Sequence, residues 1–201
     1  SLRGVLNAEG EVQDSATYRV GIHSSTATPH GWNEPMAETA QPDAVGHSNA
    51  NLMWTPNGER MYFTWIDADG AKHLATRTPN GPAQVLTGLE THPDATQPWA
   101  FDFNGQAMLL FAASGGEGGL DIWIGDLNGN SIVGIRNAGN RVNTPGNECT
   151  PSFDGSTNTL WFSSDFHAGL GGYDIFRSAL KNDGGGAVEH VRGLNSPAND
   201  L

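Results

Sequence analysis

The stretch Leu160-Trp-Phe-Ser-Ser-Asp-Phe-His-Ala-Gly-Leu-Gly-Gly-Tyr-Asp-Ile-Phe-Arg177 decides the fold, because a shorter copy of it lies about fifty residues upstream. That copy is Leu109-Leu-Phe-Ala-Ala-Ser-Gly-Gly-Glu-Gly-Gly-Leu-Asp-Ile-Trp123. Each copy has an apolar run of strand-forming residues, a glycine-rich turn, and a second run that opens on Asp-Ile and an aromatic residue. Two such runs joined by a turn predict two adjacent antiparallel strands.

The same order of short strands recurs along the chain. The turn glycines Gly58, Gly105 and Gly155 are 47 and 50 residues apart, and each follows an Asn or Asp as tight hairpins require. Four strands are expected around each of these turns: 51–54, 61–66, 72–77 and 83–86; 97–101, 108–112, 120–124 and 131–135; 150–153, 160–164, 173–180 and 187–191. A period of this size with four strands per repeat predicts an all-β chain, a β-propeller or propeller segment of about four four-stranded antiparallel blades.

The chain is expected to be one domain, with approximate blades at 1–45, 46–90, 91–142 and 143–193. In the irregular first unit, residues 17–23 and 31–35 are predicted as outer strands and 2–6 as a further strand. The segment Val142-Asn-Thr-Pro-Gly-Asn-Glu148 recurs as Leu194-Asn-Ser-Pro-Ala-Asn-Asp200. Residues 194–201 therefore either lead into a further blade, which is the interpretation we prefer, or help to close a four-bladed ring with residues 2–6.

Composition agrees with short strands and restricts the partners. The chain has 27 glycines and 11 prolines, and only 16% of its residues are charged. A formal net charge of −12 would repel a phosphate backbone or an anionic lipid surface, so nucleic acid is excluded as a partner. No apolar run approaches the roughly 18 residues of a membrane span, so direct membrane insertion is not expected. Cys149 is the single cysteine, which excludes an internal disulfide.

The repeated segments carry a resemblance to a known family. Asn-(Ser/Thr)-Pro-x-Asn-(Glu/Asp), Pro-Ser-Phe with Asp-Gly, Phe162-Ser-Ser-Asp165 and Gly171-Gly-Tyr-Asp-Ile-Phe176 are similar to the WD40-like repeats of TolB-type propellers of bacterial cell-envelope proteins. The likeness is closest over residues 143–180, good over 91–124 and loose over 46–78. Members of that family are mostly binding and scaffolding modules, and a minority of related propellers are glycan-processing enzymes or accompany peptidase domains.

The resemblance implies a non-catalytic module that binds a protein or a glycan in the bacterial cell envelope or exterior. Its location would be periplasmic, outer-membrane-associated or secreted. A glycan-active hydrolase or lyase is one alternative, and a calcium-dependent adhesion or assembly module is another. The sequence contains no nucleophile elbow and no closely spaced pair of histidines, so no catalytic residue is assigned and no cofactor is expected.

Polar residues just before the first strands of successive blades are the candidate ligand-binding residues. In a propeller these segments reach one face near the central channel, where their side chains could converge. The candidates are His47, His92, Asp94, Asn147 and Glu148. The catalytic alternative would use Asp94 or Glu148 as an acid or base beside one of the histidines.

Other conspicuous residues have structural explanations. Asp121 and Asp174 each follow a Gly-Gly turn at the start of a strand, where a carboxylate can accept backbone N–H bonds, and Gly171 and Gly172 are expected to turn the chain there. The segment that begins at Asp126 is similar in composition to a calcium-binding loop. It lacks the glycine and the glutamate that such a loop requires, so a polar hairpin turn is expected.

Overall fold

The computed structural model describes residues 23–37, 48–182 and 184–201, and within these ranges the protein is built of strands and turns with no helix. The all-β class predicted from the repeat is confirmed. The ranges therefore also contain no helix that is long and apolar enough to cross a membrane. The predicted strand at 2–6 and most of the one at 17–23 lie outside the described residues, as does His47.

Three sheets of four antiparallel strands make up most of the described chain, and in each one the strands are joined in sequence order. The second blade contains β5 (Ser48–Trp54), β6 (Met61–Ile66), β7 (Lys72–Arg77) and β8 (Gln84–Val85). The third contains β9 (Thr96–Phe103), β10 (Gln106–Ala113), β11 (Asp121–Asn128) and β12 (Ser131–Asn137). The fourth contains β13 (Glu148–Asp154), β14 (Thr159–Ser164), β15 (Asp174–Lys181) and β16 (Gly184–His190).

In the first unit the described residues form short paired strands rather than a four-stranded sheet. β1 (His23–Ser24) pairs with β4 (Met36–Ala37), and β2 (Ala27–Thr28) pairs with β3 (Gly31–Trp32) inside it. The prediction of an outer strand over 31–35 is therefore met only at Gly31 and Trp32. Trp32 is 74% exposed, so no sheet covers it.

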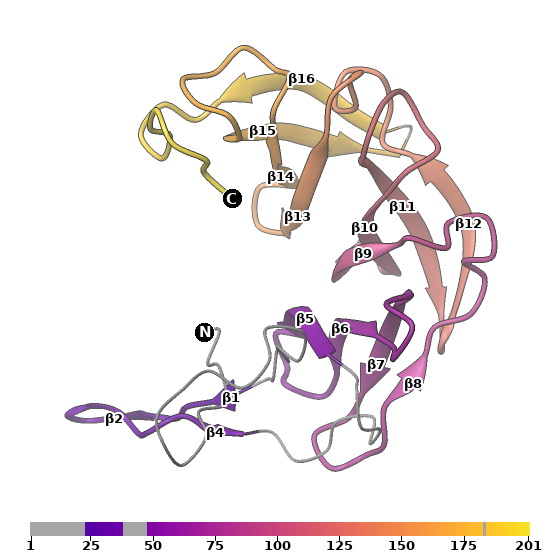
Figure 1. The fold of residues 1–201 in the computed structure, drawn as a ribbon, viewed down its shortest axis with the longest axis vertical. Coiled ribbons are helices and arrows are strands. Elements are labelled where there is room, and N and C mark those ends of the chain that lie inside the picture. Colours follow the sequence, from indigo (N-terminus) through magenta and orange to yellow (C-terminus); the bar gives the residue numbers. More distant parts are fainter. Residues whose placement is uncertain (1–22, 38–47, 183) are drawn as a thin grey trace, which may run out of the picture.

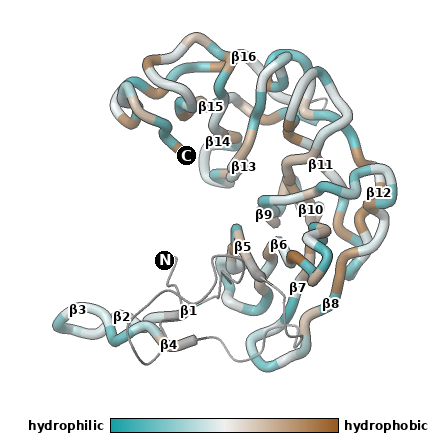
Figure 2. The backbone as a smooth tube through the Cα atoms, in the orientation of Figure 1, coloured by the Kyte–Doolittle hydropathy of each residue, from teal (hydrophilic) through white to brown (hydrophobic). Residues whose placement is uncertain are grey.

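The three complete blades fan around a common centre (Figure 1). Strands β5, β9 and β13 lie innermost, whereas β8, β12 and β16 lie at the periphery. Hydrophobic stretches gather on the strands and hydrophilic ones at the turns (Figure 2). This arrangement brings the first strand of every blade to the axis, where the three strands can share a site.

The core lies between the blades, and β10 shows why. Its side chains alternate between the two faces of the sheet. Leu109 and Phe111 pack with Tyr62 and Leu74 of the second blade, whereas Met108, Leu110 and Ala112 pack with Phe153, Leu160, Phe162 and Phe176 of the fourth. Both faces of the third blade are thus buried, which explains why β10 is a continuous apolar run rather than an alternating one.

Leu110 tests the contact between the third and fourth blades. Its side chain is fully buried, so replacing it with alanine should leave a cavity and lower the free energy of unfolding by about 2–5 kcal/mol. Val133 of β12 is 47% exposed and supplies the control, because Val133→Ala should change stability by less than about 0.5 kcal/mol. Urea denaturation measures both, and equal effects would show that the blades do not depend on this contact.

Candidate functional site

Each innermost strand has the same irregularity near its middle. The pairing of β5 with β6, of β9 with β10 and of β13 with β14 shifts register at equivalent places. At those places Asn51, Gln97 and Thr150 have φ angles of 49°, 57° and 49°, in the left-handed region that residues other than glycine rarely adopt. Such β-bulges redirect a strand and often lie beside functional sites.

The bulges also join neighbouring blades. The N–H of Gln97 donates to Thr64 Oγ1 of the second blade at 3.0 Å. One blade further on, the N–H of Thr150 donates to Gln97 Oε1 at 2.7 Å. A backbone N–H that the bulge withdraws from its own sheet therefore gains a partner in the preceding blade, which avoids the cost of leaving it unpaired.

A cavity of about 190 Å³ lies where the three bulges meet, and we call it the axial cavity. Every inner strand contributes three consecutive residues to its wall, starting with the left-handed one: Asn51, Leu52 and Met53; Gln97, Pro98 and Trp99; Thr150, Pro151 and Ser152. These side chains are amides, hydroxyls and apolar groups, and none of them is ionisable. None of these residues was predicted from the sequence as a ligand-binding residue, because the residue types at these positions do not by themselves indicate a bulge.

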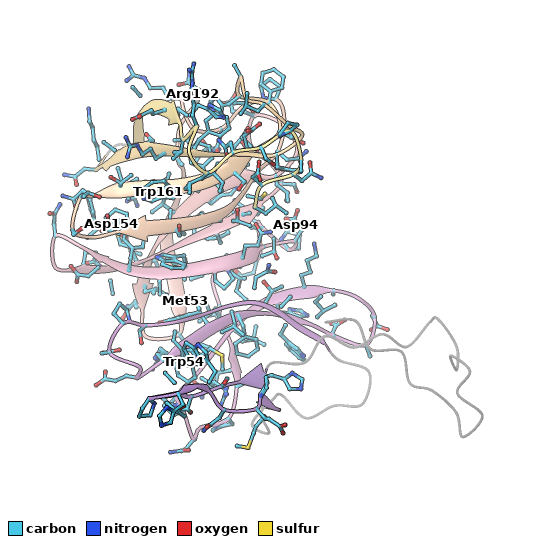
Figure 3. The ribbon with its side chains drawn as sticks, turned by 90° about the vertical axis from the view of Figure 1, so that its left-hand side faces the viewer. Met53, Trp54, Asp94, Asp154, Trp161 and Arg192 are labelled. Atoms are coloured by element: carbon cyan, nitrogen blue, oxygen red, sulfur yellow. The ribbon has the colours of Figure 1, made fainter. Side chains whose placement is uncertain are left out.

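The described residues proposed from the sequence, which are His92, Asp94, Asn147 and Glu148, lie at one end of the blades instead. Asp94 marks that end in Figure 3, and Asp154, the last residue of β13, marks the other. Glu148 is fully buried and accepts three hydrogen bonds, from Thr144 N–H at 2.7 Å, Thr144 Oγ1 at 2.6 Å and Ser164 Oγ at 2.6 Å. Its carboxylate is enclosed by the chain in this structure.

Asn147 connects two blades. Its Oδ1 accepts a bond from the Leu120 N–H of the third blade at 3.0 Å, and its Nδ2 donates to Asp165 Oδ2 in the fourth at 2.8 Å. Asp165 also accepts a bond from the N–H of Asn147 at 2.7 Å. Both polar atoms of the Asn147 side chain therefore make hydrogen bonds within the protein, one to the third blade and one to the fourth.

His92 and Asp94 lie before β9. His92 is 8% exposed and packs edge-on against Trp123, with ring centroids 4.3 Å apart. Burial lowers the pKa of His92, and the nearby Asp94 carboxylate opposes that change only in part. Oδ2 of Asp94 accepts a bond from the Ser114 N–H at 3.0 Å, whereas its Oδ1 is buried without a hydrogen-bond partner in the described structure.

The recurring Asn-(Ser/Thr)-Pro-x-Asn-(Glu/Asp) segment makes the same bonds in both of its copies. Asn143 Oδ1 accepts from the Ile122 N–H at 2.8 Å and its Nδ2 donates to the Ile122 carbonyl at 2.9 Å; Asn195 holds Ile175 in the same way, at 2.7 and 2.9 Å. Asn199 likewise accepts a bond from Tyr173 N–H, as Asn147 does from Leu120. We call this set of bonds between a connecting loop and the preceding third strand the loop latch.

Gly171 and Gly172 lie beneath the latch. A Cβ atom on Gly171 would overlap the carbonyl oxygen of Ala198, and one on Gly172 would overlap Asn199 Oδ1. Neither glycine has a positive φ angle. The reason for glycine here is therefore the close approach of the loop, rather than the freedom to turn that the sequence analysis invoked. Gly118 and Gly119 meet the preceding copy of the loop in the same manner.

The two aspartates after these glycines bond to their own turns. Oδ1 of Asp121 accepts from the Glu117 N–H at 3.1 Å. Oδ2 of Asp174 accepts from the Leu170 and Gly171 N–H groups at 2.8 and 2.9 Å, and its Oδ1 lies 3.2 Å from His190 Nε2. Burial opposes ionisation of Asp174, yet these hydrogen bonds outweigh it and hold the pKa of Asp174 below its usual value. Both carboxylates therefore accept bonds from the backbone of the turn that precedes them.

Comparison with known proteins supports the fold and leaves the function open. No family model and no curated protein sequence matches the chain. Among solved structures, TolB from Acinetobacter baumannii superposes with a TM-score of 0.56 at 17% identity, over 84% of this chain and 37% of that one. An exo-β-1,3-galactanase from Clostridium thermocellum superposes with a TM-score of 0.55 at 14% identity, over 90% of this chain and 44% of that one.

A puromycin-hydrolysing peptidase from Mycobacterium tuberculosis also gives a TM-score of 0.55, at 15% identity over 82% of this chain and 28% of that chain. The chain spans less than half the length of these three proteins. The likeness therefore shows a TolB-like propeller-type fold, which is shared by proteins of different activities and does not transfer any of them.

Gly171→Ala tests the loop latch. The new methyl group would overlap the backbone of Ala198, so the loop must move and stability should fall by about 1–3 kcal/mol. Gly193→Ala is the matched control, because its Cβ would meet nothing within 4 Å and its φ is not in the left-handed region. Thermal denaturation compares the two, and equal melting temperatures would rule out the close approach as the reason for Gly171.

Asp174→Asn tests the carboxylate of the fourth blade through pH. Because the folded-state pKa of Asp174 is lowered, the ionised group stabilises the fold above the usual aspartate pKa, about 3.9, and this contribution is lost as pH falls through the lower folded-state value. The stability difference between wild type and variant should be largest near neutral pH and shrink below about pH 4. Urea titrations across pH measure it, and a stability difference that stays the same from neutral pH to below about pH 4 would contradict a role for the ionised carboxylate.

Proposed function

We propose that this protein is a non-catalytic binding module of the bacterial cell envelope or exterior, which holds a protein or glycan partner at the axial cavity. The observation that carries the proposal is the wall of that cavity. All three innermost strands present equivalent residues there, and none of the nine is ionisable in a chain of net charge −12.

The chemistry of the wall suits a neutral ligand that makes many hydrogen bonds. The side chains of Asn51, Gln97 and Ser152 can donate and accept, which complements sugar hydroxyls or a peptide backbone. Trp99 is half-buried and adds an aromatic surface to the wall. Ligand sites commonly combine an apolar wall with a few polar groups that set orientation.

A catalytic role has less support from the residues near the axis. Glu148, one of the two carboxylates considered from the sequence, is enclosed by Thr144 and Ser164. Burial raises the pKa of Cys149 to about 11, so its thiol remains protonated near neutral pH and is a poor nucleophile. A bound partner, rather than a reacting substrate, fits these environments better.

A glycan-active hydrolase or lyase is the second candidate. Its support is the Asp94 carboxylate, whose Oδ1 is buried without a hydrogen-bond partner in the described structure, next to His92. A carboxyl group in that position could serve as a general acid or base. A calcium-dependent module is a third, and its support is the net charge of −12. The described residues contain no group of three or more His, Cys, Asp or Glu side chains that could hold a metal ion.

Leu52→Arg tests the axial cavity. Leu52 is 42% exposed and lines the cavity, so a longer charged side chain should obstruct the site without disturbing the core. Binding to a glycan array or an envelope protein partner should weaken at least tenfold at unchanged melting temperature. Val133→Arg is the matched control, since Val133 is 47% exposed on the outer strand β12 and should leave binding unchanged.

The same proteins distinguish the candidates. Equal binding by Leu52→Arg and wild type would place the ligand elsewhere and refute the axial proposal. Turnover of any glycan by wild type that is abolished in Asp94→Asn, at unchanged stability, would establish the hydrolase or lyase instead. A melting temperature that rises across a calcium titration would favour the calcium-dependent module.

A further inference from the structure

The junction between the second and third blades lacks the loop latch. The bulge residues align the loops, so that Glu90, Asp94 and Ala95 occupy the places of Asn143, Asn147 and Glu148. A carboxylate replaces the first amide of the latch, a second carboxylate replaces the other amide, and a methyl group replaces the buried glutamate. A carboxylate accepts hydrogen bonds but cannot donate one, so Glu90 cannot repeat the pair of bonds that Asn143 makes with Ile122.

These residues bond within their own loop or blade instead. Glu90 Oε1 accepts a bond from the Gly88 N–H at 3.3 Å, and Asp94 Oδ2 bonds to Ser114 of the third blade. At the start of the third strand, His73 occupies the position equivalent to Asp121 and Asp174. Its Nε2 lies 2.9 Å from Asp67 Oδ2, in a hydrogen bond. The polar side chains that fill the other junctions are therefore absent or directed elsewhere here.

A cavity of about 300 Å³ lies in their place, between the first residues of β7 and the loop that leads to β9. Its lining residues are Ala71, Lys72, His73, Leu74, Val85, Leu86, Leu89, Glu90, His92, Pro93 and Ala95. Leu74 and Leu86 are buried, and Leu89 is half-buried, so the deeper wall is apolar. This volume is at the lower end of the range for small-molecule sites, about 300–1,000 Å³.

Two opposite charges stand at its rim. Lys72 and Glu90 are exposed lining residues, and neither makes an ion pair within the parts of the chain that the structure describes. The chain has ten Lys and Arg residues against 22 Asp and Glu residues. Lys72 therefore offers a ligand carboxylate a cation beside an apolar cavity in a protein that is acidic overall.

We propose that this cavity is a site for a small zwitterion with an apolar body, such as a free apolar α-amino acid. The ligand carboxylate would approach Lys72, its ammonium would approach Glu90, and its side chain would enter between Leu74, Leu86 and Leu89. Each charge gains an opposite partner at an exposed rim, where desolvation is small, and the apolar group leaves water. The site is separate from the axial cavity, with which it shares no lining residue.

L-leucine is the probe for this site. Calorimetry and saturation-transfer NMR should detect its binding to the full chain. N-acetyl-L-leucinamide, 4-methylpentanoate and 3-methylbutylamine lack both charges or one of them, and they should bind more weakly by about fivefold for each missing charge. Lys72→Met and Glu90→Gln should each weaken leucine binding about fivefold, and Ala95→Leu should abolish it by filling the cavity.

Lys181→Met and Glu59→Gln remove the same charges outside the cavity and should leave leucine binding unchanged. Lys72 and Glu90 are exposed, so their variants should fold even if Ala95→Leu does not. We expect a dissociation constant of roughly 1 mM for a ligand of this size. If no binding is detected at a leucine concentration about 10 times higher, the proposal is overturned. Equal binding of the uncharged analogue would overturn it as well. Leu52→Arg should bind leucine normally, which separates this site from the axial proposal.

Discussion

The third blade of this protein has two apolar faces, and a four-stranded sheet can bury both of them only against other sheets. The third blade shows the consequence, because alternate residues of β10 pack against the second blade on one side and the fourth blade on the other. Hydrophobic burial holds the blades together but has no direction of its own. The position of one blade on the next must therefore be fixed by directional bonds.

Two sets of hydrogen bonds supply that direction. Near the axis, the bulges at Gln97 and Thr150 turn a backbone N–H toward the preceding blade. At one end of the blades, the loop latch ties Asn143 and Asn195 to both polar groups of one residue in the third strand. Both candidate ligand sites follow from these devices: the axial cavity lies where three bulges meet, and the second cavity lies where the latch is missing.

The repeat and the hairpin turns predicted the fold class and most strands of the second, third and fourth blades. The predicted strand ends were least accurate where pairing with a neighbouring strand, rather than the residue pattern, sets the strand length. β8 covers only Gln84–Val85 of the expected 83–86, and β11 extends to Asn128, beyond the expected end at 124. The polar residues before the first strands were selected because they recur at one face. The structure places Asn147 and Glu148 in hydrogen bonds between and within blades, and equivalence of position alone could not distinguish such bonds from a free ligand site.

The sequence by itself determined the all-β architecture, the period of the blades and the neutral or acidic character of the surface, because these depend on local turn chemistry, on side-chain alternation and on composition. Only the tertiary structure decided which polar groups remain available to a partner. Asn51, Gln97 and Thr150 are unremarkable in sequence and meet at the axis only when three strands bulge at equivalent places. Gly171 and Gly172 likewise need to be glycine because Ala198 and Asn199, each 27 residues later in the chain, lie against them.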